Sequence, residues 1–148
     1  MTAPVATRLG RDNIFVEAQM LQSLMSRFVP LQAPLTSVNF DGDSFSTTAK
    51  TLIDLSTVFG APAGIKAISV LVAVRDAASA GTDAYLVLGP TNVATVGMSF
   101  SPYGRANDTW DRGSAIVACD VRGDIYYQIL ASAAGTFDVV IQIYGYFI

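Results

Sequence analysis

With 148 residues the chain is long enough for one domain with a buried core; 51% of its residues are hydrophobic and only 14% are charged. The formal net charge of −3 and the isoelectric point near 4.6 argue against nucleic-acid binding, which requires a basic surface. Because histidine is absent and Cys119 is the only cysteine, Ser-His-Asp and Cys-His catalysis are excluded, and no enzyme, cofactor or structural metal site is expected.

Residues 1–34 are predicted to form an N-terminal arm that differs in character from the rest of the chain. Asp12 is suited to cap a short helix over 12–28, along which apolar residues recur at helical spacing. Pro30 and Pro34 would then end the helix and impose an extended connector. The apolar stripe of this helix either packs on the chain's own domain or docks onto a neighbouring subunit. The side chains expected to dock are Phe15, Leu21, Leu24, Met25 and Phe28.

Between residues 35 and 148 the chain alternates between short strand-like segments and turns rich in glycine, proline and aspartate. Eight or nine such strands, with no helices alternating between them, predict an all-β domain. The expected architecture is a β-sandwich of jelly-roll type with about eight strands. The strands are expected at residues 36–40, 44–49, 51–55, 65–75, 84–89, 93–100, 114–121, 124–131 and 136–147.

Two short polar segments are interpreted mainly as turns. Asp41-Gly42-Asp43 offers oxygen ligands of the kind that calcium prefers, but it lacks further acidic ligands, so a solvated turn and a cation site both stay open. Arg122-Gly123-Asp124 predicts a tight hairpin turn in which Gly123 takes a positive φ. The same tripeptide resembles an integrin-recognition motif, although turn geometry explains it fully.

The loop over residues 101–113 is the most distinctive polar cluster and the candidate ligand site. An aromatic ring beside aspartates is the combination that sugar binding uses, because the ring covers an apolar sugar face and the polar groups bind its hydroxyls. The alternatives are a structural loop anchored by the tryptophan and a loop that contacts a neighbouring subunit. The expected glycan contacts are Tyr103, Asp108, Trp110 and Asp111.

The segment 136–148 alternates as a strand at first and ends in the apolar run Gly145-Tyr146-Phe147-Ile148. Chain ends normally fray and carry polar residues unless they are held in place. This apolar end therefore predicts a strand that is paired inside a sheet or sealed against another subunit. Aromatic residues also concentrate in the last two predicted strands, and aromatics are enriched in interfaces. The expected oligomer interface comprises Tyr126, Tyr144, Tyr146, Phe147 and Ile148.

The stretch from Asp120 to Ile148, with Tyr126-Tyr127-Gln128-Ile129 and an aromatic–Gly–aromatic ending, resembles the last strands of trimeric jelly-roll modules of the C1q/TNF type. Phage tail-fibre heads and capsid decoration proteins use related β modules. The helix-and-proline arm departs from the C1q/TNF pattern. With few charges and no histidine, the chain looks more like a bacteriophage structural protein, which implies a role in building or decorating a virion.

The leading hypothesis is therefore a non-enzymatic virion structural protein, made in the host cytoplasm, that self-associates as a trimer and contacts other virion proteins through its arm. No signal peptide or membrane-length apolar run is present, so no membrane partner is expected. The low charge content has two interpretations: part of the surface does not face water, or the domain has few helices. The alternative function is a carbohydrate-binding module for receptor recognition.

Overall fold

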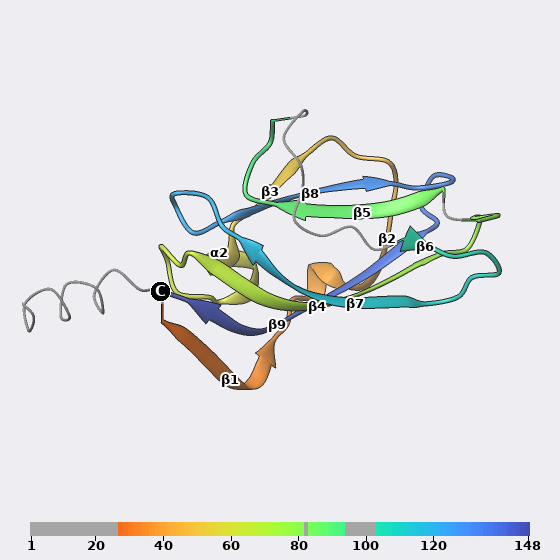
Figure 1. Cartoon of the computed structure of the whole chain (residues 1–148). Coiled ribbons are helices and arrows are strands. Elements are labelled where there is room, and N and C mark those ends of the chain that lie inside the picture. Colours follow the sequence, from red (N-terminus) through yellow and green to blue (C-terminus); the bar gives the residue numbers. More distant parts are fainter. Residues whose placement is uncertain (1–26, 82, 94–102) are drawn as a thin grey trace, which may run out of the picture.

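The computed structural model describes residues 27–81, 83–93 and 103–148, which form two antiparallel β-sheets packed face to face (Figure 1). The all-β sandwich expected from the sequence is confirmed. The larger sheet has the order β1-β9-β4-β7, with β2 also paired to β9, and the smaller has the order β3-β8-β5-β6. The larger sheet contains β1 (Phe28–Leu35), β2 (Asp41–Phe45), β4 (Ala67–Asp76), β7 (Asp111–Ala118) and β9 (Phe137–Phe147). The smaller sheet contains β3 (Thr51–Ile53), β5 (Ala84–Gly89), β6 (Tyr103–Gly104) and β8 (Ile125–Leu130).

Successive strands wrap around the core by crossing from one sheet to the other. The connections from β2 to β3, β3 to β4, β4 to β5, β6 to β7, β7 to β8 and β8 to β9 all change sheet, whereas β5 and β6 are neighbours. Both β1 and β2 pair with β9 and together occupy one place in the order. This wrapping is that of a jelly roll.

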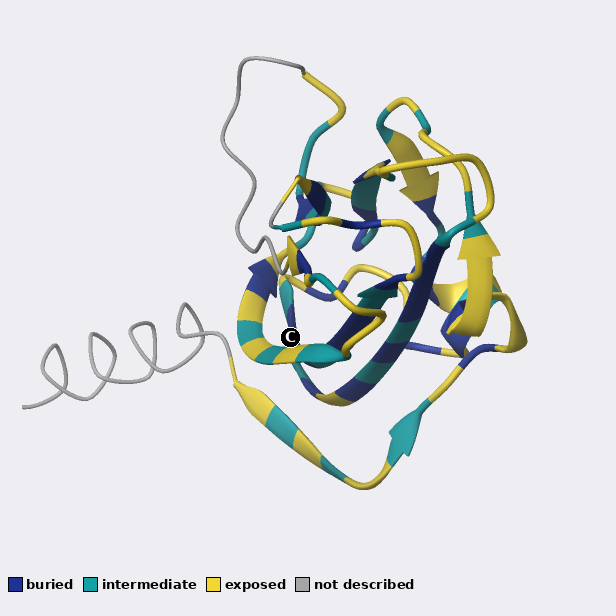
Figure 2. Cartoon of the chain, turned by 90° about the vertical axis from the view of Figure 1, so that its right-hand side faces the viewer, coloured by how far each residue is buried: buried dark blue, intermediate teal, exposed yellow. Residues whose placement is uncertain are grey.

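The long strands β4 and β9 lie at the centre of the larger sheet because their period-2 pattern supplies a continuous apolar face (Figure 2). Their inward side chains pack against those of β5 and β8, and this contact is the hydrophobic core. The core residues of β4 and β9 are Ile68, Val70, Val72, Val74, Phe137, Val139, Ile141 and Ile143.

The end of the predicted N-terminal arm belongs to strand β1 of the sandwich. Phe28 already belongs to this strand, so the helix predicted over 12–28 does not extend to residue 28, and residues 12–26 lie outside the described part of the chain. The extended backbone expected around Pro30 is present, but it pairs with β9 instead of forming a free connector: Phe28 lies opposite Phe147 and Pro30 opposite Gly145. Proline is tolerated because β1 is an edge strand.

Four other segments differ from the prediction. Residues 38–40 form the 3-10 helix η1 (Val38–Phe40) instead of a strand, because the Ser37 hydroxyl accepts from the Asn39 amide and caps it. Asp41-Gly42-Asp43 lies inside β2 at a register shift, with Gly42 at φ 91°, so the expected turn is a bulge. The strand expected over 51–55 ends at Ile53, because Asp54 caps the short helix α2 (Leu55–Phe59). Of 93–100, only Val93 is described, and it is not in a strand.

The Arg122-Gly123-Asp124 turn has the predicted positive φ of 95° at Gly123. It is not a hairpin, however, because β7 and β8 belong to different sheets. A Cβ on Gly123 would lie 2.7 Å from the amide nitrogen of Gly64, and the Asp124 carboxylate accepts a hydrogen bond of 3.1 Å from the Leu55 amide. The tripeptide therefore joins three segments of the fold.

Candidate functional site

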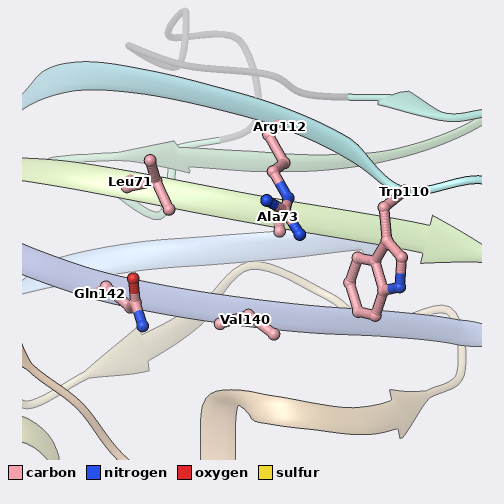
Figure 3. A pocket seen from close by; sticks show the side chains of 6 residues that line it. All are labelled: Leu71, Ala73, Trp110, Arg112, Val140 and Gln142. Atoms are coloured by element: carbon pink, nitrogen blue, oxygen red, sulfur yellow. The ribbon is translucent and has the colours of Figure 1, made fainter.

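The outer face of the larger sheet carries an open hollow of about 260 Å³. Its floor consists of outward-facing residues of β4 and β9, which the register places side by side: Ala73 lies opposite Val140, and Leu71 lies opposite Gln142. On the other side Arg112 of β7 lies opposite Ala73. Figure 3 shows Trp110 and Arg112 both reaching from the β7 side across β4. The lining residues are Leu71, Ala73, Trp110, Arg112, Val140 and Gln142.

Arg75 stands at the edge of this hollow and holds one side of the tryptophan. Its guanidinium carbon lies 4.8 Å from the centre of the Trp110 ring, a cation–π contact. Its Nε lies 3.0 Å from Oδ2 of Asp138 and 3.2 Å from Oδ1 of Asp108. The hydrogen bond to Asp138, followed by the charge of Asp108, raises the pKa of Arg75. The positive charge of Arg75 is therefore permanent and already paired with two carboxylates.

Both oxygens of the Asp138 carboxylate accept hydrogen bonds from side chains of neighbouring strands. Its side chain is only 9% exposed, and its Oδ1 accepts a hydrogen bond of 2.7 Å from the Ser44 hydroxyl of β2. Its Oδ2 accepts from Arg75. This row of side chains ties β2, β9 and β4 together at the Trp110 end of the sheet and gives the ring a rigid support.

Two of the four predicted glycan contacts come together at the hollow. Trp110 lines it, and Asp108 reaches its edge through Arg75. Asp108 and Asn107 adopt positive φ values of 54° and 64°, which aspartate and asparagine tolerate better than most residues. The tight turn that results carries Asp108 back toward β4.

The other two predicted contacts lie elsewhere. Asp111 is the first residue of β7 and precedes Arg112, which lines the hollow; successive side chains of a strand point to opposite faces of a sheet, so Asp111 points away from the hollow. Its Oδ1 instead accepts a hydrogen bond of 3.0 Å from Nε of Arg105 and forms an ion pair with Nη2 of the same residue at 2.9 Å. Tyr103 belongs to β6 in the smaller sheet, where its ring lies 5.9 Å from that of Tyr85. Neither residue lines the hollow.

A second surface forms where the two ends of the described chain meet. Figure 1 shows the C-terminus beside the start of β1. Phe28 and Phe147 pack with their ring centres 4.9 Å apart, and the backbones of Arg27 and Ile148 exchange hydrogen bonds of 3.0 and 3.1 Å. Ile116 of β7 faces the same side of the sheet. We call this end of the sheet the terminal surface: it comprises Phe28, Ile116, Tyr144 and Phe147, together with Ile148, which follows Phe147 at the end of β9.

The terminal surface includes three of the five predicted interface residues. Tyr144, Phe147 and Ile148 belong to it, whereas Tyr146 packs partly against the core. Tyr126 lies in β8 of the smaller sheet, opposite Leu52 and Gly89. Of the predicted docking residues, Phe28 joins the terminal surface, and Phe15, Leu21, Leu24 and Met25 lie outside the described residues.

No known protein family matches this chain, and no curated protein matches its sequence. No helix in the described ranges is long and apolar enough to cross a membrane. Those ranges also contain no group of three or more acidic or cysteine side chains that could hold a metal ion, and Asp41 and Asp43 are exposed in β2. The function is therefore inferred from the arrangement of the chain's own side chains.

Proposed function

We propose that this protein is a non-enzymatic structural component of a virion, either a capsid decoration or a tail-fibre protein. It self-associates as a trimer through the terminal surface and docks onto the particle through its N-terminal segment. The observation that carries the proposal is the terminal surface itself. Phe28, Ile116, Tyr144 and Ile148 are 43–61% exposed, and such an apolar cluster is typical of a protein–protein contact.

The size of the terminal surface indicates how much of the assembly it can drive. Burying a large apolar side chain fully contributes about 1.5–3 kcal/mol, so the four half-exposed side chains and the partly buried Phe147 together contribute roughly 5 kcal/mol. Association costs about 4–15 kcal/mol in lost freedom of motion. The terminal surface alone lies near the lower end of that range. We therefore expect residues 1–26, which continue from this point of the fold, to add contacts in the assembled particle.

Light scattering on the purified chain tests self-association. We expect a mass of three times the 15.6 kDa chain. Ile116→Thr, which changes a 61% exposed side chain of the terminal surface, should raise the dissociation constant roughly 5- to 30-fold. Val121→Thr is the matched control, because Val121 is 97% exposed at a turn and should leave the mass unchanged. A monomer at all concentrations, or equal effects of both substitutions, would contradict the proposal.

Removal of residues 1–26 tests docking onto the particle separately from self-association through the terminal surface. This truncation leaves β1 intact, so the shortened chain should keep the folded sandwich. We expect it to keep the terminal surface and lose attachment to the particle. Unchanged attachment would show that the N-terminal segment is not the docking element.

The hollow favours carbohydrate binding as a second candidate function. An aromatic ring held rigidly by Arg75 at the edge of an open hollow is suited to cover the apolar face of a sugar. The hollow and the terminal surface lie toward opposite ends of the same sheet face, since the register places Trp110 beyond Asp111 and Phe28 opposite Phe147. One protein can therefore carry both functions, as receptor-recognition parts of a virion require.

A further inference from the structure

We infer that the hollow binds an acidic saccharide, that is, a sugar unit carrying a carboxylate or a sulfate group. The inference rests on the carbohydrate-binding candidate and specifies its ligand class. Its basis is the chemical nature of the polar groups that line the hollow, above all the exposed guanidinium of Arg112, which is positively charged and only donates hydrogen bonds.

The shape and floor of the hollow suit a single sugar unit. Its volume of about 260 Å³ lies just below the ~300–1,000 Å³ of pockets for drug-sized ligands. The floor is formed by the small or apolar side chains of Leu71, Ala73 and Val140 (Figure 3). The indole of Trp110 forms one wall, so the apolar C–H face of a sugar ring has a surface to pack against.

Arg112 is the charged side chain among the residues that line the hollow. It is exposed, and within the described ranges it forms no ion pair, whereas Arg75 is paired with Asp108 and Asp138. A guanidinium presents a planar fork of N–H groups that matches a carboxylate or sulfate with two parallel hydrogen bonds. Arg112 therefore remains available to an anionic group of a ligand.

The neutral polar groups of the lining also favour an acceptor. Figure 3 shows the six-membered ring of Trp110 turned toward the other lining residues and its indole nitrogen on the far side, so Gln142 is the neutral polar group to consider. The Oε1 of Gln142 already accepts a hydrogen bond of 3.1 Å from the Tyr144 hydroxyl, which occupies one of its two lone pairs, whereas both N–H groups of its amide remain for a ligand. A neutral sugar offers hydroxyls that need acceptors as well as donors. The carboxylate or sulfate of an anionic sugar offers oxygen atoms that only accept, and these fit a lining in which N–H donors predominate and one side chain is positively charged.

One charge opposes the binding of an anion. The group of Arg75, Asp108 and Asp138 carries one excess negative charge beside the hollow. Asp108 is 46% exposed, so water and salt screen its field, whereas Arg112 would contact the ligand directly. Direct contact is the stronger effect, and the net preference is for an acidic ligand.

The experiment uses the full chain and Trp110 fluorescence, which reports on the hollow because Trp110 is the only tryptophan. An array of uronic-acid, sialylated, sulfated and neutral glycans identifies a ligand, and its carboxylated and sulfated members distinguish the two anionic groups. The best glycan is then titrated against the wild type, Arg112→Gln and Arg122→Gln. Arg122 is the matched control, because it is exposed at the turn between β7 and β8 and its substitution removes the same charge.

We expect acidic glycans to bind and to change the tryptophan emission. Arg112→Gln should weaken their binding roughly 10- to 100-fold, as for a lost charge-assisted hydrogen bond, and Arg122→Gln should change it less than twofold. Binding of neutral glycans alone would overturn this inference and leave the carbohydrate-binding candidate standing. Binding of a polyglutamate peptide but of no glycan, or no binding at all, would overturn both. Glycan binding that Arg112→Gln leaves unchanged would place the ligand elsewhere and also overturn the inference.

Discussion

Gly145 is the position where one added methyl group tests how β1 is held to the sheet. A Cβ at this residue would lie 2.5 and 2.6 Å from Cζ and Cε2 of Phe28, and 2.9 Å from the carbonyl oxygen of Val29. These distances are shorter than non-bonded atoms tolerate. Gly145→Ala must therefore displace the Phe28 ring, shift β1, or both. In either case the terminal surface changes shape.

The exposure of Phe28 sets the expected magnitude. Its side chain is 44% exposed, so a little more than half of the roughly 1.5–3 kcal/mol for full burial of a large apolar side chain is at stake. Phe28→Ala should thus reduce the free energy of unfolding by about 1–1.5 kcal/mol. Gly145→Ala adds the strain of overpacking and should cost about 1–2 kcal/mol. In the Phe28→Ala background the ring is absent, and only the contact with the Val29 carbonyl remains. Gly145→Ala should then cost about 1 kcal/mol less.

Denaturant unfolding of the wild type, the two single variants and the double variant measures this coupling. All four chains are compared at the same protein concentration, because association would shift their apparent stability. Gly81→Ala serves as the control, since a Cβ at that residue would have no neighbour within 4 Å. Effects of Gly145→Ala and Phe28→Ala that add to within about 0.3–0.5 kcal/mol would refute the packing of Phe28 over Gly145.

Two further predictions concern ionisable groups of the described core and its border. Burial raises the pKa of Asp76, but hydrogen bonds from the Ser132 hydroxyl and two backbone amides outweigh it and hold this pKa below its usual value. The stability that ionised Asp76 contributes is complete above the ordinary pKa of 3.8 and is lost as the pH falls below that value. Asp76→Asn should therefore make the free energy of unfolding depend less on pH in acid and should reduce it by about 1–3 kcal/mol at pH 7. An unchanged acid-unfolding profile would contradict this. Burial, followed by the charges of Asp120 and Asp124, raises the pKa of Cys119 to about 12. Iodoacetamide at pH 8 should therefore alkylate Cys119 much more slowly in the native protein than in denatured chains, and equal rates would show that the thiol is accessible.

The fold could be predicted largely because the sequences of two long strands, β4 and β9, are typical of buried strands. In β9 every second residue is apolar over most of the strand, and β4 contains an apolar run from Ala67 to Val74 that only Ser69 interrupts; both patterns are typical of strands buried in a sheet. Strand β1 was missed because its prolines exclude a central strand but not an edge strand, and local sequence does not reveal the partner that makes an edge. The sequence Asp41-Gly42-Asp43 suits a turn and a bulge equally well, and only the pairing of β2 with β9 distinguishes the two.

The site was predictable only in part. Trp110 stood out as the one tryptophan in a polar segment, and it does line the hollow. Asp111 was wrongly grouped with it, because the segment was treated as a loop and the alternation of a strand was not applied to it. The floor residues, such as Leu71 and Val140, come from strands about 70 residues apart in the chain. Their juxtaposition depends on strand order and register, which no pattern within either strand encodes.

Tyr144 connects the two surfaces of this sheet face. Its ring is 43% exposed and belongs to the terminal surface, while its hydroxyl donates to Gln142 in the lining of the hollow. If the terminal surface is buried in an assembly, Tyr144 loses rotational freedom and Gln142 is held with its amide nitrogen available to a ligand. Binding affinity would then be higher in the assembled protein than in the monomer. By thermodynamic linkage, an acidic saccharide would stabilise the assembly by the same factor.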